Sequence, residues 1–71
     1  MRDRGEFEVL TTRQIQIVRL LSQGFQDGQI SEQLCISVET VRAHVKRAMS
    51  RLRASTRSQA VAEAMRRAYI S

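Results

Sequence analysis

Residues 37–53 read SVETVRAHVKRAMSRLR, and their apolar side chains recur every three or four positions. This spacing predicts a helix over residues 38–53, because residues three and four apart share one helical face. Ser37 is a suitable N-cap, and Glu39 places negative charge at the positive end of the helix dipole. The predicted apolar face, which we expect to lie in the core, consists of Val38, Val41, Val45, Ala48, Met49 and Leu52.

The opposite face of this predicted helix is cationic and has no large apolar side chain. Arg42 is near the helix N-terminus, where its guanidinium can enter a DNA major groove and donate two hydrogen bonds to guanine O6 and N7. Ala43 permits close approach, and Lys46 can reach a base or a phosphate. Arg47 and Arg51, at the flank, are better placed for phosphate oxygens. The candidate nucleic-acid-binding residues are therefore Ser37, Thr40, Arg42, Ala43, Lys46, Arg47 and Ser50.

Positive charge is concentrated in this same segment. The full chain has a net charge of +5 at pH 7, and residues 38–53 contain five arginine or lysine residues against one glutamate. Such a basic segment indicates a polyanionic partner, of which nucleic acid is the most common. From charge alone two alternatives stay open: a helix face that is merely solvated, and a helical interaction module that binds RNA or an acidic protein through the same face.

Two shorter helices are predicted before the basic one. Thr11 opens a T-x-x-Q capping box, which predicts a helix that follows it and stops at Gly24. Asp27 is the expected N-cap of a second helix over residues 28–34. Cys35 then lies in a short turn, where we expect a small buried or half-buried filler. Two helices joined by a short turn, the second long and basic, have the outline of a helix-turn-helix.

A fourth helix is predicted from a cap at Ser58 through about Ala68. Its helical wheel has two apolar stripes, of which only one can face the core. The stripe suited to the core comprises Ala60, Val61, Ala64 and Ala68. The second stripe is a candidate dimer interface and comprises Ser58, Ala62, Met65 and Tyr69. Residues 1–9 show no sustained period and are expected to form an N-terminal arm.

Length and composition exclude several classes of protein. A chain of 71 residues is one small domain, and its helical periodicity predicts an all-α fold. The single Cys35 and the single His44 cannot form an internal disulfide or a tetrahedral zinc site. His44 is beside the apolar face without a Ser or Cys partner, so we expect a structural role and no enzyme activity. No cofactor is expected, no long apolar run predicts a membrane span, and the expected location is the cytoplasm.

Short motifs follow one another along the chain in a specific order and spacing. They are Leu10-Thr11-x-Arg13, Leu20-Leu21-x-x-Gly24, Ile30-x-x-x-Leu34, Ile36-Ser37-x-x-Thr40-Val41-x-x-His44-Val45, Leu52 and Arg57-Ser58-Gln59-Ala60-Val61. Together they resemble the LuxR/GerE-type helix-turn-helix of bacterial transcription regulators. The resemblance extends from residue 10 to residue 70, which is nearly the whole chain.

The resemblance implies a compact four-helix domain over residues 10–71, in which the third helix reads the major groove and the fourth pairs two protomers. It implies base contacts for Arg42, Ala43 and Lys46 and a phosphate contact for Thr40. We therefore expect a dimeric, sequence-specific double-stranded DNA-binding transcription regulator of the bacterial nucleoid that reads DNA with helix 38–53. If the protein activates transcription, RNA polymerase is expected as a further partner. A minority of relatives are stand-alone regulators of about this length, which a chain starting at Met1 resembles.

The resemblance also places Arg53 where the family usually has glycine or asparagine. Positive φ, which glycine adopts without cost at a helix end, is strained for an arginine. We therefore expect the basic helix to continue one or two residues past this position.

Overall fold

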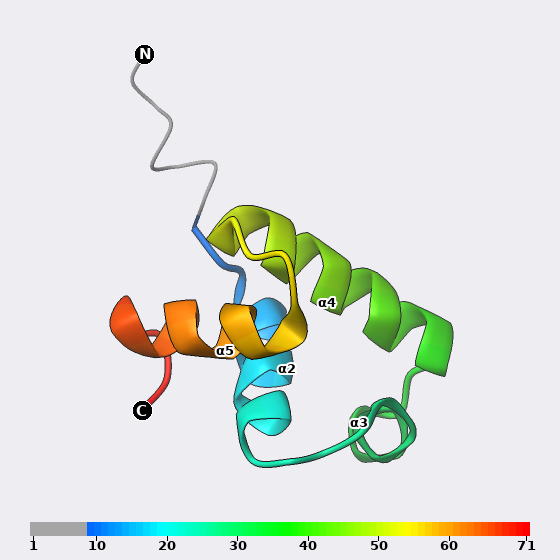
Figure 1. Ribbon diagram of the computed structural model, residues 1–71. Coiled ribbons are helices and arrows are strands. Elements are labelled where there is room, and N and C mark those ends of the chain that lie inside the picture. The colour runs from blue at the N-terminus through cyan, green and yellow to red at the C-terminus, as the bar shows by residue number, and fades with distance from the viewer. Residues whose placement is uncertain (1–8) are drawn as a thin grey trace.

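The computed structural model describes residues 9–71, in which four helices and no strand are present (Figure 1). The helices are α2 (Thr12–Ser22), α3 (Asp27–Leu34), α4 (Val38–Leu52) and α5 (Arg57–Arg66). The predicted all-α fold is confirmed. Of the predicted arm over residues 1–9, only Val9 lies within the described part of the chain, and residues 1–8 lie outside it.

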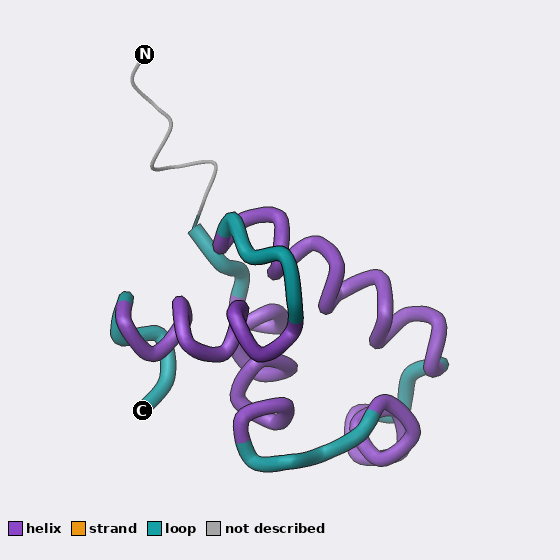
Figure 2. Tube along the Cα trace, in the orientation of Figure 1, coloured by secondary structure: helices purple, strands orange, loops and turns teal. Residues whose placement is uncertain are grey.

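Helix α4 is the longest and contacts each of the other three helices (Figure 2). One core cluster joins it to α2 and α5 and contains Leu10, Val18, Ala48, Leu52, Ala60, Ala64 and Ile70. A second cluster joins it to α2 and α3 and contains Ile17, Leu20, Ile30, Val41 and Val45. Met49 packs against both clusters. The inner face of α4 is thereby fixed from two sides, and full burial of one aliphatic side chain stabilises the fold by roughly 1.5–3 kcal/mol.

Helix α2 begins as its capping box predicts. The Gln14 N–H donates to Thr11 Oγ1 at 3.1 Å, and the Thr11 N–H donates to Gln14 Oε1 at 3.0 Å. Two otherwise unpaired backbone donors are thus satisfied at the helix start. The chain leaves the helix after Ser22, and Gly24 has a φ of 91°. A side chain at that φ would be strained, which explains a glycine at the predicted end of the helix.

Helix α3 begins differently from the prediction. Asp27 is its first helical residue, and the cap position belongs to Gln26, whose N–H donates to Gln29 Oε1 at 2.8 Å. The expected N-cap role of Asp27 is therefore wrong. Its carboxylate instead accepts hydrogen bonds from Arg42 and Arg57, because two guanidiniums offer stronger, charge-assisted partners than a backbone N–H.

Helix α5 also differs at both ends. Its cap is Thr56, whose Oγ1 accepts the Gln59 N–H at 3.0 Å, so the predicted cap at Ser58 is wrong. The helix ends at Arg66 and not near Ala68, which has a φ of 63° and is exposed. That residue therefore does not belong to the core stripe. The reversal lets Ile70 return to the core, and its burial offsets the strained backbone before it.

Two further residues adopt the left-handed conformation at helix ends. Arg53 has φ 57° and ψ 42°, so the expected continuation of the basic helix is wrong and α4 ends at Leu52. The following N–H, of Ala54, donates to the Met49 carbonyl at 2.9 Å, which satisfies an acceptor that the helix end leaves open. Cys35, at the end of α3, has φ 58° and is exposed, so the expected buried filler is also wrong. The neighbouring Ile36 is the turn residue that packs against the core.

Candidate nucleic-acid interface

The buried face of α4 determines which of its residues reach the surface. Val41, Val45, Ala48 and Leu52 are all buried, and they define one side of the helix over three turns. Side chains on the opposite side must therefore point away from the domain. The solvent-facing surface of α4 consists of Glu39, Thr40, Arg42, Lys46, Arg47 and Ser50, all of them exposed.

The structure places the predicted binding residues on this outward surface and on the turn before it. Six of the seven candidates are exposed, and Ala43 is half-buried. The Arg42 side chain has a relative exposure of 65%, so neither the core nor a neighbouring helix covers it. The half-buried Ala43 beside it has no side chain long enough to hold the helix away from a binding partner. Their roles in DNA binding stay predictions.

The start of α4 presents a pair of linked hydroxyl groups. Ser37 Oγ accepts the Thr40 N–H at 3.0 Å, and the two hydroxyl oxygens are 2.9 Å apart in a hydrogen bond. Both side chains are exposed at the N-terminal end of α4, where the positive pole of the helix dipole lies. This arrangement suits a phosphate oxygen, which accepts hydrogen bonds from hydroxyl and N–H groups at helix N-termini.

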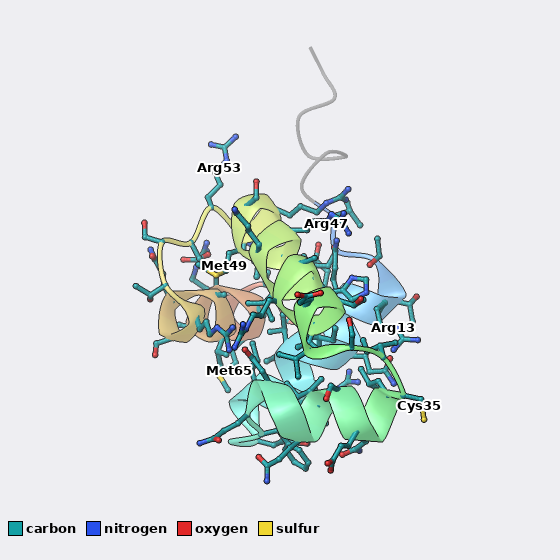
Figure 3. All side chains as sticks on the ribbon, turned by 90° about the vertical axis from the view of Figure 1, so that its right-hand side faces the viewer. Arg13, Cys35, Arg47, Met49, Arg53 and Met65 are labelled. Carbon is teal, nitrogen blue, oxygen red and sulfur yellow. The ribbon has the colours of Figure 1, made fainter. Side chains whose placement is uncertain are left out.

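Arg13 of α2 extends one edge of the outward surface, where it lies near His44 and Arg47 of α4. Burial lowers the pKa of His44, and the nearby positive charges of Arg13 and Arg47 lower that pKa further. His44 is thus held neutral at pH 7, consistent with its expected structural role. Figure 3 shows Arg13 of α2 and Arg47 of α4 on the same side of the molecule. The position of Arg13 beside α4 could not be predicted from the sequence, because Arg13 belongs to α2 and only the packing of the helices brings it near His44 and Arg47.

The C-terminal end of α4 contains two more arginines. Arg51, expected as a phosphate contact, is half-buried and its Nη1 donates to the Val9 carbonyl oxygen at 2.6 Å. This bond ties the chain before α2 to the last turn of α4. Arg53 projects from the far end of α4 (Figure 3). The exposed cationic side chains therefore extend from Arg42, in the second turn of α4, to Arg53 just beyond its end.

A three-residue ion-pair cluster occupies the other edge, and sequence reasoning missed it. Asp27 of α3 accepts a hydrogen bond from Arg42 Nε at 3.1 Å and two from Arg57 at 2.6 and 3.0 Å. The Arg57 hydrogen bonds, with a smaller contribution from Arg42, hold the pKa of the Asp27 carboxyl below its ordinary value. The carboxylate is thus ionised at pH 7. These residues line an open cleft of about 680 Å³ between the starts of α3, α4 and α5.

The predicted dimer residues are not all on one face. Ser58, Ala62 and Met65 are exposed on α5. Tyr69 lies beyond the helix end, is half-buried against the core, and its hydroxyl accepts the Leu10 N–H at 3.4 Å. Met65 and Tyr69 nevertheless both line a shallow hollow of about 450 Å³ on the surface of the domain. Tyr69 therefore contributes to the fold as well as to this hollow.

The side chains of the outward surface are chemically suited to an anionic partner. Within residues 9–71 no group of three His, Cys, Asp or Glu side chains could hold a metal ion. None of the helices α2 to α5 is long and apolar enough to cross a membrane. The outward surface of α4 instead combines positive charge, hydroxyl donors and a small central residue, which suits the phosphates and base edges of a nucleic acid.

Replacement of Arg47 by alanine is expected to weaken DNA binding by a similar factor for every DNA sequence, because a phosphate contact contains no base information. The plot of log affinity against log salt concentration should become shallower by about one unit, since one fewer counterion is released. Fluorescence anisotropy at several salt concentrations measures both quantities. Arg66→Ala is the matched control, because it removes an equal charge from an exposed site on α5. Loss of sequence preference alone would show that Arg47 reads bases.

Comparison with protein families gives a match over most of the chain. Residues 8–64 match the family described as bacterial regulatory proteins, luxR family. Two curated relatives are similar as well. The response regulator protein VraR of Staphylococcus saprophyticus is 36% identical over 62 residues, which cover 86% of this chain and 30% of that protein. The transcriptional regulatory protein DegU of Brevibacillus brevis is 30% identical over 67 residues, which cover 94% of this chain and 28% of that protein. The chain thus spans less than a third of the length of these relatives.

Solved structures show the same similarity in three dimensions. The transcription factor GerE matches with a TM-score of 0.84 and 40% identity, over 87% of this chain and 92% of that chain. The response regulator ChrA, from a heme-sensing two-component system, also matches with a TM-score of 0.84, at 32% identity. That match covers 87% of this chain and 31% of ChrA.

Proposed function

The chain belongs to the LuxR family of bacterial regulatory proteins, and from this membership we propose that it is a sequence-specific reader of double-stranded DNA that acts as a dimer. Its domain is the DNA-binding, transcription-regulating helix-turn-helix of that family, which is a family of regulators and not of enzymes. Helix α4 enters the major groove in this proposal. The observation that supports it is the outward orientation of the cationic side of α4, with its apolar side fixed in the core.

Base reading is assigned to three residues in the second and third turns of α4. Arg42 donates to guanine, since a guanidinium matches the O6 and N7 acceptors of that base. Lys46, one turn further along α4, reaches the next base or its phosphate. Ala43 lies between them and allows the helix backbone to approach the base edges. Ser50 lies one turn beyond Lys46 and contacts the DNA backbone.

Phosphate contacts are assigned to one flank of this reading surface, because Thr40 and Arg47 are seven residues apart and therefore lie on the same side of α4. Ser37 and Thr40 at the start of α4 bind the DNA backbone through their hydroxyl and N–H groups. Arg47, together with Arg13 of α2, binds the DNA backbone further along the same flank. Such contacts fix the position of the domain on the duplex without reading its sequence.

Dimerisation is assigned to α5. Met65 has a relative exposure of 46%, and beside it lies the hollow that Tyr69 also lines. In a two-fold dimer the same patch of each protomer contacts the other, so each Met65 side chain fills the hollow of its partner. Ala62 and Ser58 add a surface without bulky groups along the same helix. The two copies of α4 then read half-sites about 34 Å apart, one turn of the duplex.

The lengths of the curated relatives support a further part of this proposal. Because VraR and DegU are regulators about three times as long, we propose that this domain supplies the DNA-binding function of such a regulator at the bacterial nucleoid. Regulators of this kind act at promoters, and activation adds a contact with RNA polymerase.

Selection from random double-stranded DNA at a stated salt concentration tests the function. We expect an enriched sequence with two half-sites, which the protein binds at least ~10³-fold more tightly than random duplex. A helical module for RNA or an acidic protein gives a different result, with no enriched sequence and stronger binding to an RNA competitor. Equal affinity for selected and random DNA would contradict the proposal.

A further inference from the structure

The cluster at Asp27 connects three helices at the start of the reading surface. Arg57 donates from Nη1 to Oδ1 and from Nη2 to Oδ2, so two parallel hydrogen bonds fix the plane of the carboxylate. Asp27 has only 15% of its side chain exposed, whereas Arg42 is 65% exposed. The carboxylate is therefore the rigid member of the pair, and Arg42 is the member that projects toward solvent.

The bond between Arg42 and Asp27 uses one particular nitrogen. Nε donates to Oδ2 at 3.1 Å, and within residues 9–71 this is the sole hydrogen bond recorded for the Arg42 side chain. A guanidinium is planar, so a partner at Nε fixes the plane of the whole group. The terminal edge, formed by Nη1 and Nη2, keeps its donors for another ligand. A pair of parallel donors is what guanine O6 and N7 accept.

We propose that Asp27 is a positioning residue that holds the Arg42 guanidinium in the orientation needed to read guanine, with Arg57 fixing Asp27 in turn. This inference rests on the proposed DNA-binding function. Neither Asp27 nor Arg57 needs to touch a base. Three separate helices, α3, α4 and α5, contribute one residue each to the arrangement.

Two physical effects follow for DNA binding. Arg42 has several rotatable bonds, and fixing it before binding removes part of the entropy cost of ordering it at the base. The negative charge of Asp27 also repels nearby phosphates and acceptor-rich base edges, so it opposes binding wherever Arg42 finds no guanine. Asp27 thus raises the preference for one base pair while it lowers the affinity for unrelated DNA.

The test is Asp27→Asn, which keeps the size of the side chain and removes its charge. We expect the ratio of selected-site to random-site affinity to fall about threefold to tenfold, as part of one bidentate base contact is lost. Affinity for random duplex should stay constant or rise. A merely structural role predicts that both affinities fall together. Glu63→Gln is the matched control, because Glu63 is a carboxylate paired with Arg66 and Arg67 on α5, away from the reading surface.

A second comparison uses the variant Arg42→Ala. In that background Asp27→Asn should leave the affinity ratio unchanged, because no guanidinium remains to be oriented. An equal fall in both backgrounds would overturn the inference, as would a rise in the ratio, which would mean that Asp27 withholds Arg42 from DNA. If the wild-type protein prefers no sequence at all, the proposed function itself fails. If Arg42→Ala relaxes base choice and Asp27→Asn does not, only the positioning role fails.

Circular dichroism and thermal unfolding show whether Asp27→Asn folds. If the Asp27→Asn protein does not fold, the variant Arg57→Lys is tested in its place. Lysine keeps the positive charge but cannot bind both carboxylate oxygens of Asp27 in parallel. The affinity ratio should again fall while the random-site affinity holds. An unchanged ratio in a folded Arg57→Lys protein would overturn the proposed role of Arg57 in fixing Asp27.

Discussion

Replacement of Met65 by glutamate is expected to give a folded monomer that binds a two-half-site DNA about 10²-fold or more weakly than the wild-type protein. The two charges would face each other across the proposed two-fold interface, where burying an unpaired carboxylate is unfavourable. Loss of the dimer removes the gain in affinity that comes from linking two binding modules. Affinity for DNA with a single half-site should not change, since Met65 lies on α5 and the reading surface lies on α4. Sedimentation velocity and anisotropy measure the two effects.

The fold should tolerate this change because Met65 is exposed. Tyr69, the other candidate in the same hollow, is unsuitable for the test because it packs against the core and binds the Leu10 N–H. Val9→Glu makes the same charge change at another exposed apolar side chain outside α5, and it should leave the sedimentation coefficient unaltered. A dimer that persists in Met65→Glu would place the interface on another surface.

The variant Arg42→Ala is expected to lose about 1–3 kcal/mol of binding free energy on the selected site, roughly a factor of 5 to 150 in affinity. The loss should be confined to sequences with guanine at one position, so base choice at that position relaxes. The physical reason is that the Arg42 side chain is 65% exposed and that, within residues 9–71, the terminal edge of its guanidinium makes no hydrogen bond. Competition with duplexes that differ at a single base pair measures the effect position by position.

Arg42→Lys separates base reading from charge. Lysine keeps the positive charge but lacks the rigid pair of donors, so it should recover affinity for random DNA and not the preference for guanine. If Arg42→Ala weakens selected and random DNA to the same degree, Arg42 contacts a phosphate and the rotation of α4 in the groove differs from the one proposed here.

The fold was predictable wherever a short run of residues decides it. The capping box at Thr11, the N-cap at Ser37 and most of the buried face of α4 each depend on residues within one or two helical turns, and the structure confirms them. The exception on that face is Val38, which is half-buried and lines the open cleft beside Asp27. The exposure of Arg42 and Lys46 follows from the same periodicity, because a helix with one apolar face must direct the opposite face toward water. Much of the candidate interface could therefore be described before the fold was known.

Three of the errors arise where a distant part of the chain competes with a local preference. Asp27 is a good N-cap in isolation, yet its carboxylate binds arginines 15 and 30 positions away. Arg53 accepts a positive φ because the turn after it must bring α5 back against α4. Ala68 does the same so that Ile70 can reach the core. At Arg53 and Ala68, the free energy cost of the positive φ is small compared with the stabilisation from the apolar burial that it permits.

Local sequence thus determined the presence of the four helices, the caps of α2 and α4 and the cationic side of α4, because hydrogen bonds and periodicity act over a few residues. Only the tertiary structure decided which residues of other helices lie next to the cationic side of α4. Arg13 lies near Arg47, and Asp27 lies between Arg42 and Arg57. Electrostatic contacts of this kind depend on distance in space, and the packing of the helices, not the order of the chain, sets that distance.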